Sequence, residues 1–519
     1  MTTVREVFFD VCRDAGLTTW FGNPGSTELR MLRDWPDGFE YVLALQEASA
    51  VGIAAGHAIA TGGPALVSLH SAGGVGHALG AIFNAHRDRV PLVVVAGQQT
   101  RAMLPTRPFL GADEPATFPR PYVKWSRQPE RAADVPAALA EALRVAMTPP
   151  RGPVFLSVPE DDWDRPAGPV PRRFVHTAFT TSPGALHEVA EALNTARAPA
   201  VVAGPGIDED GAWDQAVALA ETVRAAVWAA PMPSRAAFPE DHPLFQGYLP
   251  PVRSSVASLL APHDVVLVIG APVFTYHVHS EGPIVADGTR LFHLDCDPAA
   301  AAWAAAGTSI LTTVRAGLTA LLDLVEPSSR PAPPARSRPP AAPLTDPLTA
   351  SAVLALLHPM ESVLVEEAPS HKDTVHEQVP ITRPLGYVTT GSGALGWGLP
   401  VAVGRALTGE RVICVVGDGS SLYSIQALWT AAQRRAPLTV IVLNNRGYEA
   451  VASLGRRIGI TSLPGVALPE LDLTSLAHGF GVPAARVTSA AALPAALKRA
   501  LDGPYLLDVH VTTSGGSLY

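Results

Sequence analysis

Short apolar runs alternate along the chain with longer stretches in which apolar residues recur every three or four positions. The short runs are rich in Val, Leu and Ile, and turn-forming residues follow most of them, which is typical of buried strands. Strands that alternate with helices predict parallel sheets covered by helices on both faces, the doubly wound α/β architecture. The predicted strands are residues 18–21, 41–45, 65–69, 92–96, 154–158, 200–203, 227–230, 265–269, 290–294, 363–365, 412–416, 438–443 and 505–511.

Two stretches that lack this pattern divide the chain into three parts. Residues 159–173 are polar and contain prolines, and residues 326–347 carry eight prolines in 22 residues. Proline-rich segments of this kind form semi-rigid, extended connectors. We therefore predict three α/β domains, with a proline-rich linker at residues 327–347. The predicted domains are residues 1–170, 183–326 and 348–519.

Residues 48–86 contain no Asp, Glu, Lys or Arg. Glycines and a proline break this stretch into pieces too short to span a bilayer, so we interpret it as deeply buried protein interior. The N-terminus is predicted to be an amphipathic helix with Val4, Phe8, Val11 and Cys12 on one face. A signal peptide would need an unbroken apolar centre there. The sequence thus predicts no membrane association.

Charge and cysteine content exclude several classes of function. The net charge of -9 is spread over 519 residues without a basic block, so a nucleic-acid-binding or anionic-membrane surface is not expected. The three cysteines, Cys12, Cys296 and Cys414, are too far apart for a metal-binding knuckle and too few for a disulfide framework. A reducing, cytoplasmic location is the natural interpretation.

Polar residues follow two neighbouring strands of the last third. The run RVICVVGDGS ends in Gly417, Asp418 and Gly419, and the next run, PLTVIVLNN, ends in Asn445. Ligands of parallel sheets collect at the carboxyl ends of the strands, so Asp418 and Asn445 are expected to face one crevice. Together with the backbone carbonyl of Gly447 they form a set of hard oxygen ligands. Such a set suits Mg²⁺ bound to phosphate oxygens.

The spacing of GDG, 24 further residues and NN resembles the diphosphate-binding signature of thiamine-diphosphate-dependent enzymes. Within that family, the chain is most similar to the 2-oxo acid decarboxylases, in particular the benzoylformate decarboxylase branch. The resemblance covers nearly the whole chain and implies thiamine diphosphate with Mg²⁺ or Ca²⁺; we expect no flavin. The N-terminal segments that carry it are FGNPGSTEL (21–29), LALQEASAVGIAAGHA (43–58), SLHSAGGVGHALGAI (68–82), AGQQTRAM (96–103) and PRPYVKWS (119–126).

Glu47 follows a predicted strand and opens a helix of small residues. A carboxyl group in that apolar setting needs a partner, which suits a hydrogen bond to a pyrimidine nitrogen. The resemblance implies that Glu47 exchanges a proton with N1′ of the cofactor. In this family the N-terminal domain of one subunit faces the C-terminal domain of another. A dimer at least, and by resemblance a homotetramer, is therefore expected, with active sites between subunits.

Two histidines are candidates for proton transfer. His70 follows the predicted strand 65–69, and by resemblance belongs to an active-site loop. His277 matches the family's middle-domain histidine, with His279 as the alternative two residues later. Ser26 closes the turn NPGS before a helix, so it is expected to cap that helix. By resemblance its hydroxyl also contacts the substrate carboxylate.

The resemblance assigns further contacts with the cofactor. It implies that the carbonyl of Gly393 receives the 4′-amino group and that the side chain of Leu395 wedges the cofactor into a bent shape. The full set of expected cofactor contacts is Asn23, Pro24, Gly25, Glu47, Gly393, Leu395, Gly417, Asp418, Gly419, Ser420, Asn445, Gly447 and Tyr448.

The resemblance implies non-oxidative decarboxylation of a 2-oxo acid, benzoylformate or a related aryl or hydrophobic acid, to an aldehyde and CO₂, with carboligation as a side activity. Thr389, Leu454 and Pro369 depart from the family's pocket residues. The exact 2-oxo acid therefore stays open, as does a nucleotide in the middle domain. The alternatives are an acetolactate-synthase-like enzyme or acyl-CoA lyase, and, in another class, a non-catalytic regulatory protein that keeps the fold.

Overall fold

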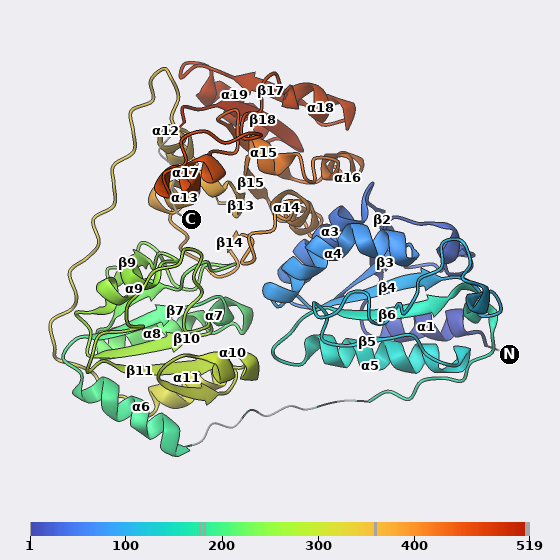
Figure 1. Cartoon of the computed structure of the whole chain (residues 1–519), viewed down its shortest axis with the longest axis horizontal. Coiled ribbons are helices and arrows are strands. Elements are labelled where there is room, and N and C mark those ends of the chain that lie inside the picture. Colours follow the sequence, from blue (N-terminus) through green and yellow to red (C-terminus); the bar gives the residue numbers. More distant parts are fainter. Residues whose placement is uncertain (1, 174, 176–178, 180–182, 358–360, 514–519) are drawn as a thin grey trace.

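Three six-stranded sheets follow one another along the chain, and every strand pair in them is parallel (Figure 1). The structure is a computed structural model that describes residues 2–173, 175, 179, 183–357 and 361–513. The predicted doubly wound α/β class is confirmed. Within the described residues, no helix combines the length and apolar character needed to cross a membrane.

The N-terminal sheet has the strand order β2-β1-β3-β4-β6-β5. Helices α3 and α4 pack on one face, and α1 and α5 pack on the other. Its strands are β1 (Thr19–Gly22), β2 (Glu40–Leu43), β3 (Ala65–Leu69), β4 (Leu92–Gln98), β5 (Ser126–Arg127) and β6 (Val154–Pro159). Its helices are α1 (Val4–Asp14), η1 (Ser26–Glu28), α2 (Leu29–Leu32), α3 (Glu47–Thr61), α4 (Ser71–Arg87), η2 (Leu104–Thr106), η3 (Ala132–Asp134), α5 (Val135–Met147) and η4 (Glu160–Asp164).

The middle sheet has the order β12-β11-β10-β7-β8-β9. Helices α6, α8 and α11 cover one face and α9 the other. Its strands are β7 (Pro199–Ala203), β8 (Ala226–Ala229), β9 (Phe245–Tyr248), β10 (Val265–Ile269), β11 (Arg290–Asp295) and β12 (Thr308–Leu311). Its helices are α6 (Pro183–Thr195), α7 (Gly206–Glu209), α8 (Trp213–Val223), α9 (Arg253–Leu260), α10 (Pro298–Trp303) and α11 (Val314–Leu322).

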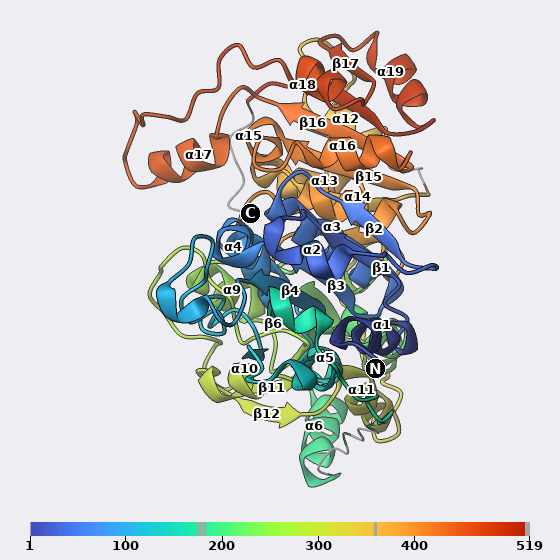
Figure 2. The same cartoon turned by 90° about the vertical axis from the view of Figure 1, so that its right-hand side faces the viewer.

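The C-terminal sheet has the order β14-β13-β15-β16-β18-β17, and α17 projects from the body beside it (Figure 2). Helices α14, α16 and α18 cover one face, and α12, α13 and α19 the other. Its strands are β13 (Val363–Glu367), β14 (Tyr387–Val388), β15 (Val412–Gly417), β16 (Leu438–Asn444), β17 (Ala484–Val487) and β18 (Tyr505–His510). Its helices are α12 (Ala350–Ala355), η5 (Pro369–His371), α13 (Lys372–Gln378), α14 (Gly398–Ala406), α15 (Asp418–Ser421), α16 (Ala427–Gln433), α17 (Glu449–Arg457), α18 (Leu473–Gly479) and α19 (Leu493–Ala500).

Each predicted strand is present, with ends that agree to within two residues. The strands that the sequence did not predict are β5, β9, β12, β14 and β17, and every one of them lies at the edge of its sheet. Strands β5 and β14 are only two residues long, and β9, β12 and β17 bury at most two of their four residues, so none of the five carries a long apolar run. Strand β12, for example, buries only one of its four residues. This explains why the pattern of apolar runs missed them.

The first predicted linker is wrong at its start. Residues 160–164 form the helical turn η4, and Trp163 is buried in the core beside Phe8 of α1. A single Trp in a polar stretch carried too little apolar signal to reveal this packing. The proline-rich segment, by contrast, contains no helix or strand and runs along the outside from the middle sheet to the C-terminal sheet (Figure 1).

The uncharged stretch 48–86 owes its composition to one helix contact. Helix α3 packs on α14, and the two share a single buried core between the N-terminal and C-terminal sheets. The backbones approach so closely that a Cβ at Gly56 would collide with the carbonyl of Val401, and one at Gly404 with that of Ile53. Only small residues allow this contact, which fixes the position of both sheets.

We expect Gly404→Ala to destabilise the protein, because the added methyl group must push α3 and α14 apart. The cost is about 1–3 kcal/mol of unfolding free energy, seen as a lower thermal midpoint. Gly479→Ala is the matched control, since Gly479 is helical, exposed and has open space around its Cβ position. Equal midpoints for the two variants would contradict this account of the interface.

Candidate functional site

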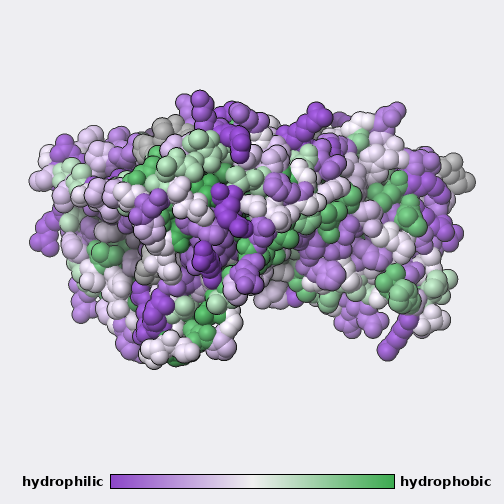
Figure 3. All heavy atoms as spheres, turned by 90° about the horizontal axis from the view of Figure 1, so that it is seen from above, coloured by the Kyte–Doolittle hydropathy of each residue, from purple (hydrophilic) through white to green (hydrophobic). Residues whose placement is uncertain are grey.

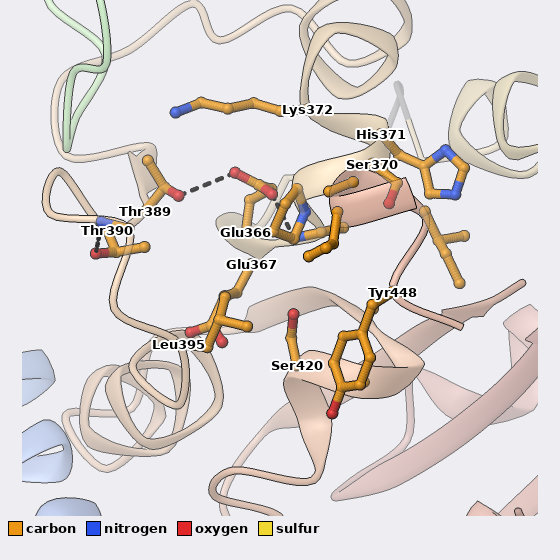
Figure 4. A pocket seen from close by; sticks show the side chains of 18 of the residues that line it. Glu366, Glu367, Ser370, His371, Lys372, Thr389, Thr390, Leu395, Ser420 and Tyr448 are labelled. Carbon is orange, nitrogen blue, oxygen red and sulfur yellow. Dashed lines mark hydrogen bonds between the residues drawn. The ribbon is translucent and has the colours of Figure 1, made fainter. Parts of the chain in front are cut away.

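A cavity of about 370 Å³ lies at the carboxyl ends of β13, β15 and β16. Most of its walls come from the C-terminal sheet and its loops, with Met232 and His277 contributed by the middle part of the chain. Figure 4 shows the side chains that line it. The described lining residues are Met232, His277, Glu366, Glu367, Ala368, Pro369, Ser370, His371, Lys372, Thr389, Thr390, Ser392, Gly393, Leu395, Gly417, Asp418, Gly419, Ser420, Leu443, Asn445, Gly447, Tyr448, Ala450 and Val451.

Asp418 and Asn445 point to the same place. The N–H of Gly447 donates to Oδ2 of Asp418 at 3.0 Å and to Oδ1 of Asn445 at 3.2 Å. Burial raises the pKa of Asp418, although backbone N–H groups around it act in the opposite direction. A carboxylate oxygen and an amide oxygen that converge in this way fit Mg²⁺ or Ca²⁺ by the chemistry of their donor atoms. The described residues contain no cluster of three His, Cys, Asp or Glu that could hold a metal.

The turn after β15 brings backbone close to the cavity. Gly417 is the last residue of β15, and the short helix α15 starts at Asp418. The ring of Tyr448 lies against Gly419 so closely that a Cβ there would collide with it. Gly419 and Tyr448 therefore form one wall, with the Ser420 side chain next to them (Figure 4).

Glu367 holds the loop that carries Gly393 and Leu395. Its carboxyl group, at the end of β13, accepts hydrogen bonds from the backbone N–H groups of Gly396, Trp397 and Gly398. Burial raises the pKa of Glu367 to about 7, against the effect of these donors. Gly393 has a φ of +79°, which a residue with a side chain rarely adopts. The fixed loop places Leu395 in the cavity wall (Figure 4).

Glu47 lies in a second cluster, formed by the N-terminal sheet. It is the first residue of α3, and Oε1 accepts a hydrogen bond from Nδ2 of Asn23 at 3.3 Å. Its other oxygen lies 3.1 Å from Nδ1 of His77, whose side chain is 70% exposed. The carboxyl end of β1 and the start of α3 thus meet at one carboxylate.

His70 belongs to the same cluster. Its Nδ1 lies 3.1 Å from Glu28 and 3.0 Å from the hydroxyl of Thr27, and the hydrogen bond with Glu28 raises the pKa of His70. Gly25 packs directly against the imidazole ring. The predicted cap at Ser26 is wrong: Gly25 occupies the N-cap position of η1, and its N–H donates to Glu28 at 2.8 Å. A backbone donor paired with a glutamate three residues later took the place of a serine cap.

The candidate residues therefore form two groups within one chain. The described lining of the cavity includes Asp418, Asn445, Leu395 and the other C-terminal candidates, but none of Asn23, Pro24, Gly25, Ser26, Glu47 or His70. Of the two middle-domain histidines, His277 lines the cavity, whereas His279 is 85% exposed and lies 3.2 Å from Glu281.

Two of the three pocket residues expected from the sequence line the cavity. Thr389 and Pro369 are part of its wall, but Leu454 is not; from α17, Ala450 and Val451 line it instead. These two residues lie at the start of α17, whereas Leu454 comes one turn later. The place of Leu454 in the substrate pocket therefore stays a prediction.

The sequence analysis did not identify several residues of the two groups. Glu28 and His77 act through partners that are 42 and 30 residues away, so only the folded structure pairs them with His70 and Glu47. Glu366 and Glu367 could have been found, because two carboxylates at the carboxyl end of an apolar run break the pattern of buried strands. Lys372 is one of only three lysines in the chain, but this rarity alone does not indicate that it lines a cavity.

Replacing Glu367 by Gln should change how stability depends on pH. Because the pKa of Glu367 is raised in the folded protein from 4.5 to about 7, the folded state keeps a proton that the unfolded chain releases. The free energy of unfolding of the natural protein should therefore fall, by on the order of 1 kcal/mol or more, as pH rises between those two values. In the Glu367→Gln variant the free energy of unfolding should not fall in this way, because glutamine does not ionise. Denaturant unfolding across that range checks it, and parallel pH profiles would contradict it.

Three family models for thiamine pyrophosphate enzymes match the chain. The N-terminal TPP binding domain matches residues 2–115, the central domain residues 186–321 and the C-terminal TPP binding domain residues 368–509. The last of these covers every lining residue of the cavity except Met232, His277, Glu366 and Glu367.

Relatives match over almost the full length. Benzoylformate decarboxylase from Pseudomonas aeruginosa is 41% identical over 99% of both chains. The crystal structure of benzoylformate decarboxylase from Polynucleobacter necessarius superposes with a TM-score of 0.97, 37% identity and 99% coverage of both chains. A thiamine diphosphate-dependent 4-hydroxybenzoylformate decarboxylase from Rhodococcus jostii RHA1 superposes with a TM-score of 0.95, 39% identity and 100% coverage of both chains. The family expected from the sequence is confirmed: this chain belongs to the thiamine pyrophosphate enzyme family.

Proposed function

We propose that this protein is a thiamine-diphosphate-dependent carboxy-lyase that converts an aryl 2-oxo acid, benzoylformate or a ring-substituted form of it, to the aldehyde and CO₂. The observation that carries the proposal is the convergence of Asp418 and Asn445 in a cavity at the carboxyl ends of β15 and β16. The names of the full-length relatives, two benzoylformate decarboxylases and a 4-hydroxybenzoylformate decarboxylase, support this substrate class.

Asp418, Asn445 and the carbonyl of Gly447 would hold Mg²⁺ or Ca²⁺, with the diphosphate beside Gly417, Gly419 and Ser420. Gly393 and Leu395 would support the middle of the cofactor, and Tyr448 its diphosphate end. These assignments follow from the cavity lining and from the match to the C-terminal TPP binding domain. From a neighbouring protomer, Asn23, Pro24, Gly25 and Glu47 would complete the cofactor site.

When bound, thiamine diphosphate supplies an electron sink for the electrons that remain after CO₂ leaves. Glu47 would hold a proton on the cofactor's pyrimidine, with Asn23 and His77 fixing its carboxyl group. His70 and His277 would move protons at the oxygen and carbon of the former ketone. Glu28 keeps His70 in position and favours its protonated form. Ser26 would contact the substrate carboxylate.

A second copy of the chain is needed to bring the two groups of residues together. Within one chain, Glu47 and His70 are absent from the cavity lining, which favours a dimer at least, and a homotetramer by family resemblance, with sites between subunits. Apolar side chains near the N-terminal cluster support this, since Phe109 is 85% and Leu29 61% exposed. Figure 3 shows further apolar patches on one face.

The alternatives are less well supported. An acetolactate-synthase-like enzyme or acyl-CoA lyase would use the same cofactor residues, but the decarboxylases are 37–41% identical to this chain, whereas proteins named acetolactate synthase are 24–29% identical. A non-catalytic protein would have no reason to keep Asp418, Asn445 and Glu47 in hydrogen-bonded positions. A cytoplasmic location is part of the proposal, in keeping with three unpaired cysteines.

The function is tested by incubating the protein, thiamine diphosphate and Mg²⁺ with benzoylformate, pyruvate and an acyl-CoA, and by detecting CO₂ and aldehyde. We expect benzaldehyde from benzoylformate. Glu47→Gln should lower kcat about 100-fold or more, because it removes proton transfer, while cofactor binding persists. Glu130→Gln, an exposed change, is the control. Full activity of Glu47→Gln would overturn its role, and products from the other substrates alone would overturn the substrate class.

Complementation tests whether the site lies between subunits. Glu47→Gln and Asp418→Ala should each be inactive as pure proteins. In a dimer that contains one chain of each kind, one of the two sites combines an intact Glu47 with an intact Asp418, so co-expression should restore activity. If each chain instead built its own site, the mixture would stay inactive, and that result would refute the arrangement.

A further inference from the structure

A buried lysine lines the cavity with no bond to its ammonium group. Lys372 is the first residue of α13, directly after η5, and only 6% of it is exposed. It is one of three lysines in the chain. Within the described part of the chain, its ammonium makes no hydrogen bond and no ion pair shorter than 4 Å, and it lines the cavity (Figure 4).

The nearby carboxylates do not satisfy this ammonium. The charged groups that act on it are Glu366, Asp373 and Asp88, and burial nevertheless lowers the pKa of Lys372. Glu366 already accepts hydrogen bonds from the hydroxyls of Tyr387 at 3.0 Å and Thr389 at 2.9 Å, as well as from the N–H of Ala368. An ammonium that is mostly removed from water and opens to a cavity without an acceptor is unfavourable, so a ligand that supplies one would bind favourably here.

The ammonium lies at the end of the cavity away from the proposed diphosphate site. In Figure 4 it extends above Thr389 and Glu366, whereas Leu395, Ser420 and Tyr448 lie at the opposite side, with Glu366 and Glu367 between the two. Lys372 therefore faces the part of the cavity that the cofactor's diphosphate leaves free. If the proposed function is right, this part of the cavity would take the end of the substrate that lies away from the reacting group.

We propose that Lys372 selects aryl 2-oxo acids whose ring carries an oxygen substituent that accepts a hydrogen bond, such as a phenolic hydroxyl or a carboxylate. This inference rests on the proposed function. The reacting carboxylate is an unsuitable partner, because it loses its charge on becoming CO₂. A cation bound to it would stabilise the substrate more than the transition state and would slow the reaction. The oxygen at the far end of the ring keeps its charge or dipole throughout.

The test compares 3- and 4-hydroxybenzoylformate with 3- and 4-methylbenzoylformate, which match them in size. We expect the natural protein to prefer at least one hydroxyl compound over its methyl counterpart by about 10-fold or more in kcat/KM, since a hydrogen bond to a charged group is lost with the methyl group. Lys372→Met should abolish or reverse this preference. Lys498→Met, which changes an exposed lysine on α19, should keep it.

Lys372→Met removes a buried charge and keeps an apolar chain of the same shape for all of the side chain except the terminal nitrogen, so it should fold. A fall in kcat/KM that is equal for hydroxyl and methyl compounds would overturn the proposal, since it would place Lys372 at the reacting carboxylate or in a structural role.

Binding gives an independent readout. The protein loaded with thiamine diphosphate and Mg²⁺ is titrated calorimetrically with 4-hydroxymandelate and 4-methylmandelate, and with the 3-substituted pair. These compounds lack the ketone and cannot react. A hydroxyl preference of about 10-fold in Kd that disappears in Lys372→Met supports the inference. Equal Kd values in both proteins refute it. Absence of turnover with every 2-oxo acid would refute the proposed function alone, because the binding ratio still decides the role of Lys372.

Discussion

The parallel alignment of β15 and β16 is the constraint on which the site depends. Because the strands run in the same direction and in register from Val412 to Gly417, both end at one edge of the sheet. The residues that follow them, Asp418 and Asn445, must then meet there, and they converge on the N–H of Gly447. An antiparallel pair would place these residues at opposite ends of the sheet. The motifs supply the two side chains, and the parallel strands bring them to the same edge of the sheet.

The same principle applies to the second group of candidate residues. In the N-terminal sheet, Glu47 and His70 also follow the carboxyl ends of strands, and they too are held by neighbours, Asn23 and Glu28. The close contact between α3 and α14 then fixes how the two sheets lie within the chain, with backbone against backbone at Gly56 and Gly404. Because this contact leaves little room for adjustment, it holds the N-terminal cluster apart from the cavity of the same chain. The proposed assembly, in which another protomer supplies this cluster, is consistent with that arrangement.

How far the sequence predicts this structure depends on how local the determining interaction is. Central strands such as β3 and β10 were predicted to the residue, because both their faces are buried and the apolar run records this. The five edge strands that were missed are very short or only partly buried, so they carry no such run. At the site, Asp418 and Asn445 were predicted because each belongs to a short motif, GDG or NN, that directly follows a predicted strand. Glu28 was not predicted, because its partner His70 is 42 residues away. Asp88 was not predicted either, because Gly391, whose N–H donates to it, is 303 residues away.

Charge compensation varies from one end of the cavity to the other, and this variation describes the ligand. Glu367 is surrounded by three backbone donors, and Glu366 by two hydroxyls and one backbone donor, so neither needs anything further from a ligand. Asp418 at one end shares its backbone donor with Asn445, and Lys372 at the other end has no hydrogen-bond partner among the described residues. The lining also includes Leu395 and Val451, whose side chains offer no polar groups. The proposed occupants fit these two ends: a cation and phosphates would satisfy Asp418, and an oxygen acceptor on the substrate would satisfy Lys372.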